Sequence, residues 1–313
     1  MAVPIIEVKN LYKIYKVGDT RVHALDGVDF TINKGEFCAI VGPSGSGKST
    51  LLNMLAGLEK PTKGEIIIDK IHIEHMTENQ LVEFRRKRVG FIFQSYNLLK
   101  TLNAVENVAL PLSFRGMAKK ERNAIAEKYL KLVGLEKQMY HMANAMSGGQ
   151  QQRVGIARAL AVNPRIIFAD EPTGNLDSKT TMEILKLMRR IVREQQQTLI
   201  MVTHDRDEAY QLCDNLLLFS RGRVIAAGKT KDIFNDPGSV EAARLTGCKN
   251  ISRIEKLDDH RVRALDWDNL ELVTEKTVAE DITSVGIRAH DFEPVADQET
   301  GVEIENRIPV GNP

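Results

Sequence analysis

The stretch FCAIVGPSGSGKSTLLNMLAG, residues 37–57, decides the fold of this chain. It begins with five apolar or β-branched residues that predict a buried strand (Phe37–Val41), continues with a loop that matches the pattern G-x-x-x-x-G-K-[ST] (Gly42–Ser49), and runs into an apolar helix predicted to begin at Thr50. This order predicts a phosphate site, because the N–H groups of the loop and the N-terminus of the helix both attract an anion. The alternative is a chance glycine-rich turn, which matches the pattern in roughly one chain in a hundred of this length at ordinary glycine frequency.

Two side chains of this loop are expected to carry its chemistry. We expect Lys48 to reach the β- and γ-phosphates of a nucleotide and the Ser49 hydroxyl to bind Mg²⁺. The predicted nucleotide contacts of this segment are Gly42, Pro43, Ser44, Gly45, Ser46, Gly47, Lys48, Ser49 and Thr50.

Composition sets limits on partners and location. The 313 residues include 43 Lys and Arg against 42 Asp and Glu, and the formal net charge of +1 gives no support to nucleic acid as a partner. Cys38, Cys213 and Cys248 are widely spaced and follow no metal-ligand pattern, which is typical of reduced thiols in a cytosol. The N-terminus has no signal-peptide pattern, and no apolar run approaches the ~20 residues of a membrane span. We therefore expect a chain that does not cross a bilayer by itself.

Short strands joined by turns are predicted before the glycine-rich loop. The strands are expected at Ile5–Lys9, Val22–Leu25 and Val28–Ile32, with breaks at Gly18-Asp19 and Asp26-Gly27. Such a hairpin region beside the loop is positioned to support an adenine base.

Two residues outside the loop are further candidate nucleotide contacts. Tyr15 is expected to stack on the adenine, with Tyr12 as its rival; the alternative is that either ring only covers the hairpin. Gln94 follows a predicted strand, Val89–Phe93, and is a neutral group able to contact both Mg²⁺ and water.

A basic run precedes that strand. Thr77-Glu78-Asn79-Gln80 has the spacing of a capping box and predicts the start of a helix that ends in Arg85–Arg88. Basic runs occur in nucleic-acid and lipid contacts, but four cations in the last turn also favour the C-terminal dipole of a helix. We interpret the run as a solvated helix end.

A helical insertion is predicted about residues 95–163, with helices at Asn103–Leu110 and Lys119–Val133. It ends in Ser147-Gly148-Gly149-Gln150, which has capping-box spacing and glycines that leave the backbone open to an anion. This turn predicts a second phosphate cradle, which is redundant for one nucleotide within one chain. Two cradles make sense if two copies meet head to tail, each glycine-rich loop closed by the Ser147, Gly148, Gly149 and Gln150 of the other, with Asn175 and Asp177 at the seam.

Polar residues follow two apolar strands downstream. Asp170 ends one strand and is expected to contact Mg²⁺ directly or through water. Glu171 is expected to polarise the attacking water, with Pro172 keeping Glu171 extended. His204 follows the strand Leu199–Val202 and is expected to contact a γ-phosphate or to orient the water. Because strands alternate with helices, we expect a mostly parallel sheet with the site at its C-terminal edge.

In this order the motifs resemble an ATP-binding cassette (ABC) ATPase over residues 5–228. The resemblance identifies Gly42–Ser49 with the Walker A motif, Gln94 with the Q-loop, Ser147–Gln150 with the signature (MSGGQ here, where LSGGQ is usual), Ile166–Asp170 and Glu171 with Walker B and the catalytic glutamate, Asn175–Asp177 with the D-loop, His204 with the switch histidine and Tyr15 with the A-loop aromatic. It implies a sandwich dimer that holds two ATP and docks on membrane subunits near Gln94.

The fold implied is α/β: a P-loop NTPase core of the ABC ATPase type, with a mostly parallel sheet, an antiparallel β subdomain and a helical subdomain, plus a small C-terminal β domain. We expect the ATPase domain at residues 1–230, a linker at 231–248, a short β domain similar to a TOBE domain at 249–296 and a loose tail at 297–313.

Subgroup resemblances differ between the two parts of the chain. Residues 90–99, 104–116 and 169–178 resemble lipoprotein-releasing and macrolide-exporting ATPases, whereas 241–252 and 285–294 resemble the accessory region of molybdate- and sulfate-type importer ATPases. Alternating segments near 260–265, 269–273 and 283–288 suit a small β-barrel of about sixty residues. We interpret this region as a dimer-stabilising appendage rather than a ligand sensor.

The expected function is that of an ABC transporter ATP-binding subunit that hydrolyses MgATP to drive a transmembrane permease. Catalysis is assigned to Glu171, His204 and Lys48, and Mg²⁺ to Ser49, Gln94 and Asp170. The expected partners are a second copy of the chain and the permease on the cytoplasmic side of the membrane, with an extracytoplasmic substrate-binding protein as a further possibility and no nucleic acid. Two alternatives remain: a soluble ABC ATPase acting on DNA or ribosomes, and a regulatory switch that binds nucleotide without hydrolysing it.

Overall fold

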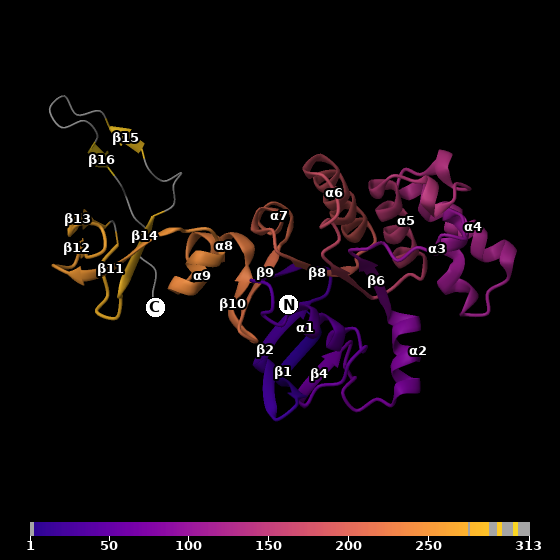
Figure 1. Ribbon diagram of the computed structural model, residues 1–313, viewed down its shortest axis with the longest axis horizontal. Helices are drawn as coiled ribbons and strands as arrows, with labels where there is room; N and C mark the ends of the chain where they lie inside the picture. The colour runs from indigo at the N-terminus through magenta and orange to yellow at the C-terminus, as the bar shows by residue number, and fades with distance from the viewer. Residues whose placement is uncertain (1–2, 275, 288–292, 296–302, 306–313) are drawn as a thin grey trace. The chain divides into compact units, whose positions relative to one another are not determined.

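The structure is a computed structural model that describes residues 3–274, 276–287, 293–295 and 303–305. The chain divides into two compact units, Met1–Val224 and Ile225–Pro313 (Figure 1). The ATPase domain was predicted to end at residue 230. The first unit ends six residues earlier, at Val224, within a strand.

A six-stranded sheet is the centre of the first unit. Its order is β10-β9-β3-β8-β7-β6. Its strands are β3 (Phe37–Val41), β6 (Val89–Phe93), β7 (Ile166–Asp170), β8 (Thr198–Thr203), β9 (Asn215–Ser220) and β10 (Arg223–Lys229), in which the chain passes into the second unit. The pairs β9-β3, β3-β8, β8-β7 and β7-β6 are parallel, as expected. Because parallel strands end at one edge of a sheet, the residues that follow β3, β7 and β8 meet there.

Helices cover both faces of this sheet (Figure 1). The helix α1 (Lys48–Leu55) lies between it and a second sheet, and its buried leucines join one hydrophobic core with residues of both sheets. The helices α6 (Ser178–Glu194) and α7 (Arg206–Leu212) cover the other face. The helix α1 begins at Lys48 rather than at Thr50, because Gly47 adopts φ 103° and caps it.

The second sheet is antiparallel, with the order β2-β1-β4-β5. Its strands are β1 (Pro4–Val17), β2 (Thr20–Asn33), β4 (Lys63–Ile68) and β5 (Ile71–His72). The turn at Gly18-Asp19 is confirmed, but the prediction of three short strands is wrong. Pairing continues through Asp26-Gly27 because register shifts absorb the left-handed residues Asn10 (φ 48°) and Gly27 (φ 71°) as bulges.

The predicted helical insertion is confirmed at one end of the first unit (Figure 1). It contains α3 (Ala104–Ser113), α4 (Lys119–Leu132), α5 (Gly148–Ala161) and the 3₁₀ turns η1 (Glu136–Gln138) and η2 (Ala143–Ala145). Before it, α2 (Glu78–Arg88) begins with the predicted capping box at Thr77. Its last-turn cations bond within the chain: Arg85 to the Gly57 carbonyl, Arg86 to the Phe114 carbonyl and Arg88 to the Asp69 carboxylate.

The second unit differs from the prediction in three respects. Its elements are α8 (Thr230–Asn235), α9 (Val240–Leu245), β11 (Asn250–Lys256), β12 (Arg261–Ala264), β13 (Leu270–Val273), β14 (Ser284–Ile287), β15 (Glu293–Val295) and β16 (Glu303–Glu305). The segment predicted as a linker therefore holds two helices. The four described strands of the predicted barrel form an antiparallel sheet, β13-β12-β11-β14, with β13 and β14 at its edges instead of paired to each other.

The predicted tail is also not wholly loose, because β16 pairs with β15. The rest of the tail, residues 297–302 and 306–313, and part of the importer-like stretch, residues 288–292, lie outside the described residues.

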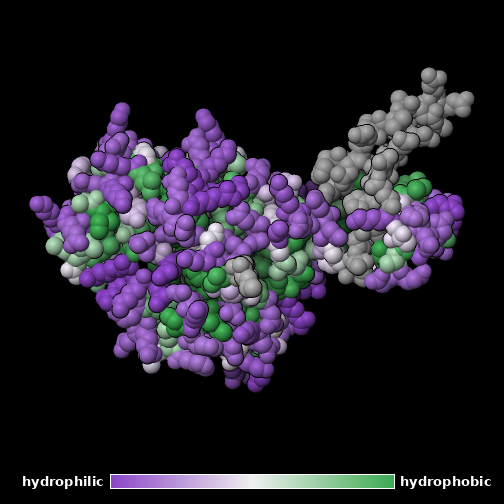
Figure 2. All heavy atoms as spheres, turned by 180° about the vertical axis from the view of Figure 1, so that it is seen from behind, coloured by the Kyte–Doolittle hydropathy of each residue, from purple (hydrophilic) through white to green (hydrophobic). Residues whose placement is uncertain are grey.

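Hydrophilic side chains cover most of the face shown in Figure 2, with smaller hydrophobic areas between them. In the part of the chain that the structure describes, no helix combines the length and the apolar character that crossing a bilayer requires.

Candidate nucleotide-binding site

The glycine-rich loop leaves β3, which is buried along its whole length. Two of its glycines are required by close contacts. A Cβ at Gly42 would lie 2.0 Å from the carbonyl oxygen of Phe219, and one at Gly47 would lie 2.3 Å from that of Ala24. Of the remaining loop residues, Pro43, Ser44, Gly45 and Ser49 are exposed, whereas Ser46 and Lys48 are buried. The exposed residues form an accessible rim around a buried cation.

Lys48 points back into the loop. Its Nζ donates to the carbonyl oxygens of Gly42 and Pro43, both at 2.8 Å, and the residue is 4% exposed. Burial lowers the pKa of Lys48, while the nearby Glu171 and Asp170 carboxylates oppose this shift. A phosphate would be a stronger partner than the two neutral carbonyls, because hydrogen bonds between ions are about twice as strong as neutral ones.

Asp170 ends β7, as predicted, and one of its two carboxylate oxygens is buried without a hydrogen-bonding partner among the described residues. This oxygen is Oδ1, and its state is uncommon for a buried polar atom. Burial raises the pKa of Asp170, and the charge of Glu171 raises it further. A cation would satisfy this oxygen, so the donor set of Asp170 and the exposed Ser49 hydroxyl fits Mg²⁺, which binds to oxygen ligands.

Pro172 predicted an extended conformation for Glu171, and this prediction is wrong. Glu171 adopts φ 44°. Its N–H still donates to the Val202 carbonyl at 3.0 Å, so it remains attached to β8, and the chain turns immediately, with the Gly174 N–H donating to the Glu171 carbonyl at 3.1 Å. Pro172 disfavours only the right-handed helical region at the preceding residue, and this turn uses the left-handed one. A left-handed non-glycine residue costs about 1–3 kcal/mol, and such strain clusters at functional sites.

His204 connects Glu171 to the glycine-rich loop. Its Nε2 lies 2.8 Å from Glu171 Oε1, and its Nδ1 lies 3.2 Å from the Gly42 carbonyl oxygen. The ends of β3, β7 and β8 are thereby joined by one side chain. The structure thus brings Lys48, Asp170, Glu171 and His204 to one edge of the sheet.

Gln94 lies beside the segment that follows Glu171. The Asn175 Nδ2 donates to the Gln94 carbonyl at 3.0 Å, and a Cβ at Gly174 would lie 2.6 Å from Gln94 Nε2. These contacts hold the strand end of β6 against the predicted seam residue Asn175.

The tyrosine nearer to the loop is Tyr15. Its hydroxyl donates to the Glu59 carboxylate at 2.8 Å and lies beside the side chain of Thr50 in α1. Burial and the bond to Glu59 raise the pKa of Tyr15. Tyr12 lies elsewhere on the hairpin, where a Cβ at Gly27 would be 3.0 Å from its hydroxyl oxygen. This placement favours Tyr15 over Tyr12 as the adenine contact.

The turn Ser147–Gln150 forms the predicted capping box at the start of α5. The Gln150 N–H donates to Ser147 Oγ at 3.3 Å, and the Ser147 N–H donates to Gln150 Oε1 at 3.0 Å. A Cβ at Gly148 would lie 2.9 Å from the Tyr96 hydroxyl, and one at Gly149 would lie 2.7 Å from Thr180 Cγ2. Within its own chain the turn therefore packs against neighbouring segments.

Asp177 is the N-cap of α6 and stands beside this turn. Its carboxylate accepts hydrogen bonds from the Thr180 N–H at 3.0 Å and from the Thr180 hydroxyl at 2.6 Å. The hydroxyl bond from Thr180, together with the smaller effect of its backbone bond, lowers the pKa of Asp177. Thr180 thus contacts both the Ser147–Gln150 turn, through Gly149, and the predicted seam residue Asp177.

Sequence analysis missed Glu208, a buried carboxylate behind the site. It accepts hydrogen bonds from the Thr173 hydroxyl at 2.9 Å and the Thr203 hydroxyl at 2.8 Å, and it is 8% exposed. Burial raises its pKa, while the two threonine bonds lower it. It ties the turn after Glu171 to the end of β8. The only available signal was an acid shortly after His204, since its partner Thr173 is 35 positions away in sequence.

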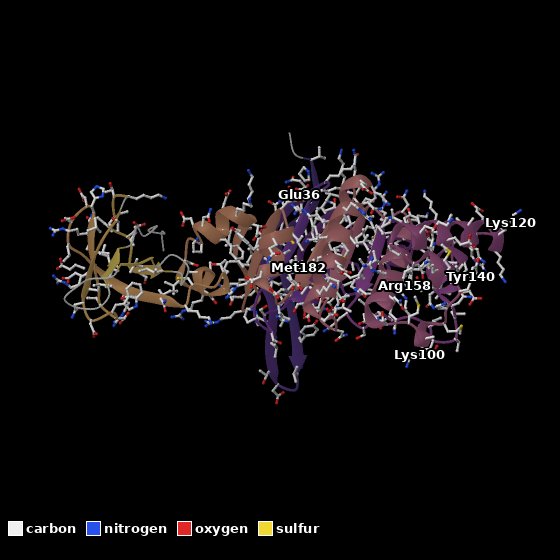
Figure 3. The ribbon with its side chains drawn as sticks, turned by 90° about the horizontal axis from the view of Figure 1, so that it is seen from above. Glu36, Lys100, Lys120, Tyr140, Arg158 and Met182 are labelled. Carbon is white, nitrogen blue, oxygen red and sulfur yellow. The ribbon has the colours of Figure 1, made fainter. Side chains whose placement is uncertain are left out.

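Arg158 was also missed, and it supports the segment after Gln94. From α5 it donates to the carbonyl oxygens of Asn97 at 2.6 Å and Tyr96 at 2.8 Å. Both acceptors are left-handed, with φ 57° at Tyr96 and 49° at Asn97. Figure 3 shows Arg158 within the helical part of the unit, with Lys120 and Tyr140 farther out.

The edge of this parallel sheet holds a glycine-rich loop with a buried lysine, a strand-end aspartate, and a glutamate in contact with a histidine. Together these features define a P-loop nucleoside triphosphatase. Comparison with known proteins then identifies the family. The ABC transporter family model matches residues 25–174. An uncharacterized ABC transporter ATP-binding protein of Thermotoga maritima is 50% identical over 201 residues, which cover 64% of this chain and 86% of that protein.

Two further similarities agree with this family. The macrolide export ATP-binding/permease protein MacB of Chlorobium phaeobacteroides is 46% identical over 224 residues, which cover 71% of this chain and 34% of MacB. The solved structure of the ATP-binding cassette MJ0796, a dimer in a post-hydrolysis state bound to ADP and Pi, has a TM-score of 0.67 and 44% identity, and covers 72% of this chain and 98% of that one. The chain belongs to the ABC transporter ATP-binding proteins and is an ATPase subunit of a transport system. The resemblance to the ABC ATPase family is confirmed. The resemblance to the lipoprotein-releasing and macrolide-exporting subgroup is consistent with these relatives.

Proposed function

We propose that two copies of this chain hydrolyse two MgATP at composite sites between them and drive a transmembrane permease. The observation that carries the proposal is the link from Glu171 through His204 to the Gly42 carbonyl, at the sheet edge where Lys48 and Asp170 also lie. One local network thereby joins Glu171 as the general base, His204 as the group that holds it, and the glycine-rich loop as the phosphate site.

In this proposal each side chain of the loop edge has one role. Lys48 exchanges its two carbonyl partners for the β- and γ-phosphate oxygens, and the Ser44–Gly47 backbone surrounds the β-phosphate. Ser49 and Asp170 hold Mg²⁺, with Gln94 as a further contact. When bound, the metal supplies positive charge to the phosphate oxygens. Tyr15 stacks on the adenine next to Thr50.

Glu171 takes the proton of the attacking water. The water oxygen forms a bond to the γ-phosphorus, the bond between that phosphorus and the β–γ bridging oxygen breaks, and the bridging electrons remain on ADP. His204 positions the Glu171 carboxylate through the 2.8 Å contact and is close enough to the loop to contact the γ-phosphate. The water proton therefore passes to a carboxylate that the fold has already oriented.

The second copy completes the site. Ser147 and Gln150 close the capping box at the start of α5 with their own N–H groups, and Gly148 and Gly149 between them offer the backbone of a helix N-terminus, a suitable anion partner. The MJ0796 cassette, which shares this fold, forms a dimer with ADP and Pi bound, and this supports the same arrangement here. Asn175 and Asp177 then lie at the seam, beside the turn that closes the neighbour's site.

The membrane partner is a permease bound on the cytoplasmic side. This part of the proposal is supported by MacB, whose name describes one protein that combines an ATP-binding part with a permease. We further propose that the small β region within residues 249–296 stabilises the dimer.

The test of this proposal is Glu171→Gln. The amide keeps the size of the carboxylate but cannot accept the water proton, so phosphate release should fall by about 10²–10⁴-fold while ATP binding remains. Size-exclusion chromatography with light scattering should show a dimer in MgATP and a monomer without it. The matched control is Glu194→Gln, an exposed glutamate at the end of α6, which should hydrolyse ATP normally. Full turnover by Glu171→Gln would refute the role of Glu171.

A mixing experiment tests the second copy. Lys48→Ala damages the loop and Ser147→Arg damages the turn, so each variant alone should be inactive. In mixed dimers one of the two composite sites carries both changes and the other carries neither, so mixing should restore part of the activity. No recovery in proven mixed dimers would contradict the composite site.

A further inference from the structure

Two histidines and a glutamate meet on the surface of the antiparallel sheet, in the segment His72-Ile73-Glu74-His75. His72 Nδ1 lies 2.7 Å from Glu74 Oε1, and His75 Nε2 lies 3.5 Å from the same oxygen. One ligand atom from each of the three residues lies within 4.8 Å of the others. None of these residues has a part in the nucleotide site.

The backbone on both sides of this segment is fixed. His72 ends β5 and pairs with Ile67 of β4. The Ile73 N–H donates to the Ile66 carbonyl at 3.0 Å, and the Met76 N–H donates to the Ile73 carbonyl at 3.1 Å. Thr77 follows directly and caps α2. The three side chains therefore project from a short turn that is held at both ends.

Glu74 is the most strongly oriented of the three. Its side chain is only 5% exposed, and its Oε2 accepts the Ile66 N–H at 3.1 Å. The carboxylate is thereby anchored to β4 through one oxygen, which leaves Oε1 directed at both imidazoles. Hydrogen bonds to the part of a ligand that does not contact the metal orient that ligand and raise the affinity of the site for the metal.

The two imidazoles lie on the solvent side of this carboxylate. Their rings are stacked, with centroids 5.8 Å apart and planes inclined by 17°. The His72 and His75 side chains are 47% and 79% exposed, so an ion can reach them and can keep water in the remaining coordination positions.

We propose that His72, Glu74 and His75 form a binding site for a divalent transition-metal ion of the zinc type. Ligand atoms about 2.0–2.2 Å from a tetrahedral zinc are separated by about 3.3–3.6 Å. The carboxylate oxygen lies 2.7 and 3.5 Å from the two imidazole nitrogens, and all three ligand atoms lie within 4.8 Å of one another, so side-chain rotations can bring them to these values. Two imidazole nitrogens and one carboxylate oxygen suit zinc, copper or nickel, whereas Mg²⁺ prefers oxygen ligands alone. The site is therefore chemically distinct from the Mg²⁺ ligands of the nucleotide site.

An ion here joins the end of β5 to the residues that enter α2. Ile73, Met76 and Thr77 are already held by backbone bonds and the helix cap, whereas the exposed His75 side chain contacts the Glu74 carboxylate and the His72 ring. Binding should thus order residues 72–77 and slow hydrogen exchange of their amides.

The test is direct metal binding by the full chain, stripped with a chelator and free of nucleotide. Zn²⁺ is titrated by calorimetry in a buffer that does not bind metals, and Co²⁺ is titrated in parallel because its visible absorption reports nitrogen ligation. We expect one site per chain that is weakened at least tenfold by His75→Ala and by Glu74→Gln. His75→Ala alters an exposed side chain and should not affect folding.

Two matched controls separate this site from others. His141→Ala removes an exposed histidine in the helical part, and His204→Ala removes the histidine of the nucleotide site; both should retain the Zn²⁺ site. Absence of binding, equal affinity in His75→Ala, or loss of the site only in His204→Ala would each overturn the proposal. None of these outcomes bears on ATP hydrolysis, which the Glu171→Gln experiment tests separately.

Discussion

The imidazole of His204 spans the distance between Glu171 and Gly42. Its Nε2 lies 2.8 Å from the glutamate Oε1, and its Nδ1 lies 3.2 Å from the glycine carbonyl oxygen. The residue proposed as the base is thus connected through a single ring to the backbone that would surround the phosphates. A displacement of the loop on nucleotide binding would be transmitted to the carboxylate without an intervening residue.

His204→Ala should lower kcat by about 10²–10³-fold and change the KM for ATP only a few-fold. The variant retains Lys48 and the loop, which bind phosphate, but it loses the group that positions Glu171. Steady-state phosphate release measures both parameters. His141→Ala is the control and should behave as the original chain. A large rise in KM with kcat unchanged would instead indicate that His204 serves binding alone.

Asp170→Asn should stabilise the folded protein by about 1 kcal/mol at neutral pH in the absence of nucleotide, while abolishing Mg²⁺-dependent activity. Burial raises the pKa of Asp170, so the folded state favours the protonated acid. The stability that the protonated acid contributes is present below the ordinary pKa of about 4 and is lost as the pH rises through the raised value.

Asparagine does not titrate, so the advantage of Asp170→Asn should appear above about pH 4 and level off once the aspartate of the original chain is ionised in the folded state. Thermal unfolding of both proteins from pH 4 to pH 8 measures this difference. A melting temperature for the variant that is lower at neutral pH would contradict the prediction.

Glu208→Ala should destabilise the protein by about 2–4 kcal/mol. It leaves the hydroxyls of Thr173 and Thr203 buried without their shared acceptor, and each unsatisfied group costs about 1–3 kcal/mol. Glu208→Gln should cost less, because its amide oxygen still accepts one hydroxyl. Urea unfolding gives both values, and equal losses for the two variants would contradict the prediction, because glutamine keeps the size of the side chain and one acceptor whereas alanine keeps neither.

Tyr15→Ala should raise the KM for ATP about tenfold, since an aromatic ring stacked on a base contributes about 1–3 kcal/mol. Tyr12→Ala removes a similar ring from the same hairpin and should leave the KM nearly unchanged, because Tyr12 lies against Gly27 rather than beside Thr50. A comparison with GTP sharpens the test if stacking also selects the base. The opposite ranking of the two variants would assign the adenine to Tyr12.

The sequence is sufficient to predict features that depend on local chemistry. The glycine-rich loop between β3 and α1, the capping boxes at Thr77 and Ser147, and the strand ends at Asp170 and His204 each have a signal within a few residues. Their convergence at one sheet edge follows from parallel pairing, which the alternation of strands and helices predicts.

Features that depend on contacts distant in sequence were not predictable in this way. The hairpin of β1 and β2 continues through Asp26-Gly27 because bulges accommodate it, and a bulge is defined by the partner strand. Glu171 pairs with Val202 of β8 and yet adopts φ 44°, where its local sequence before Pro172 predicted an extended residue. Glu208 is recognisable as part of the site only because Thr173, 35 positions away in sequence, lies beside it.

Gly149 has a consequence for how the two copies would separate. A Cβ there would be 2.7 Å from Thr180 Cγ2, and the Thr180 hydroxyl donates to Asp177. The starts of α5 and α6 are therefore closely packed against each other. The Ser147–Gln150 turn and the segment with Asn175 and Asp177, which would both face the second copy, should therefore move together. In the proposed dimer, release of one nucleotide should then weaken the contacts at the second site as well. The two copies should therefore separate in one cooperative step.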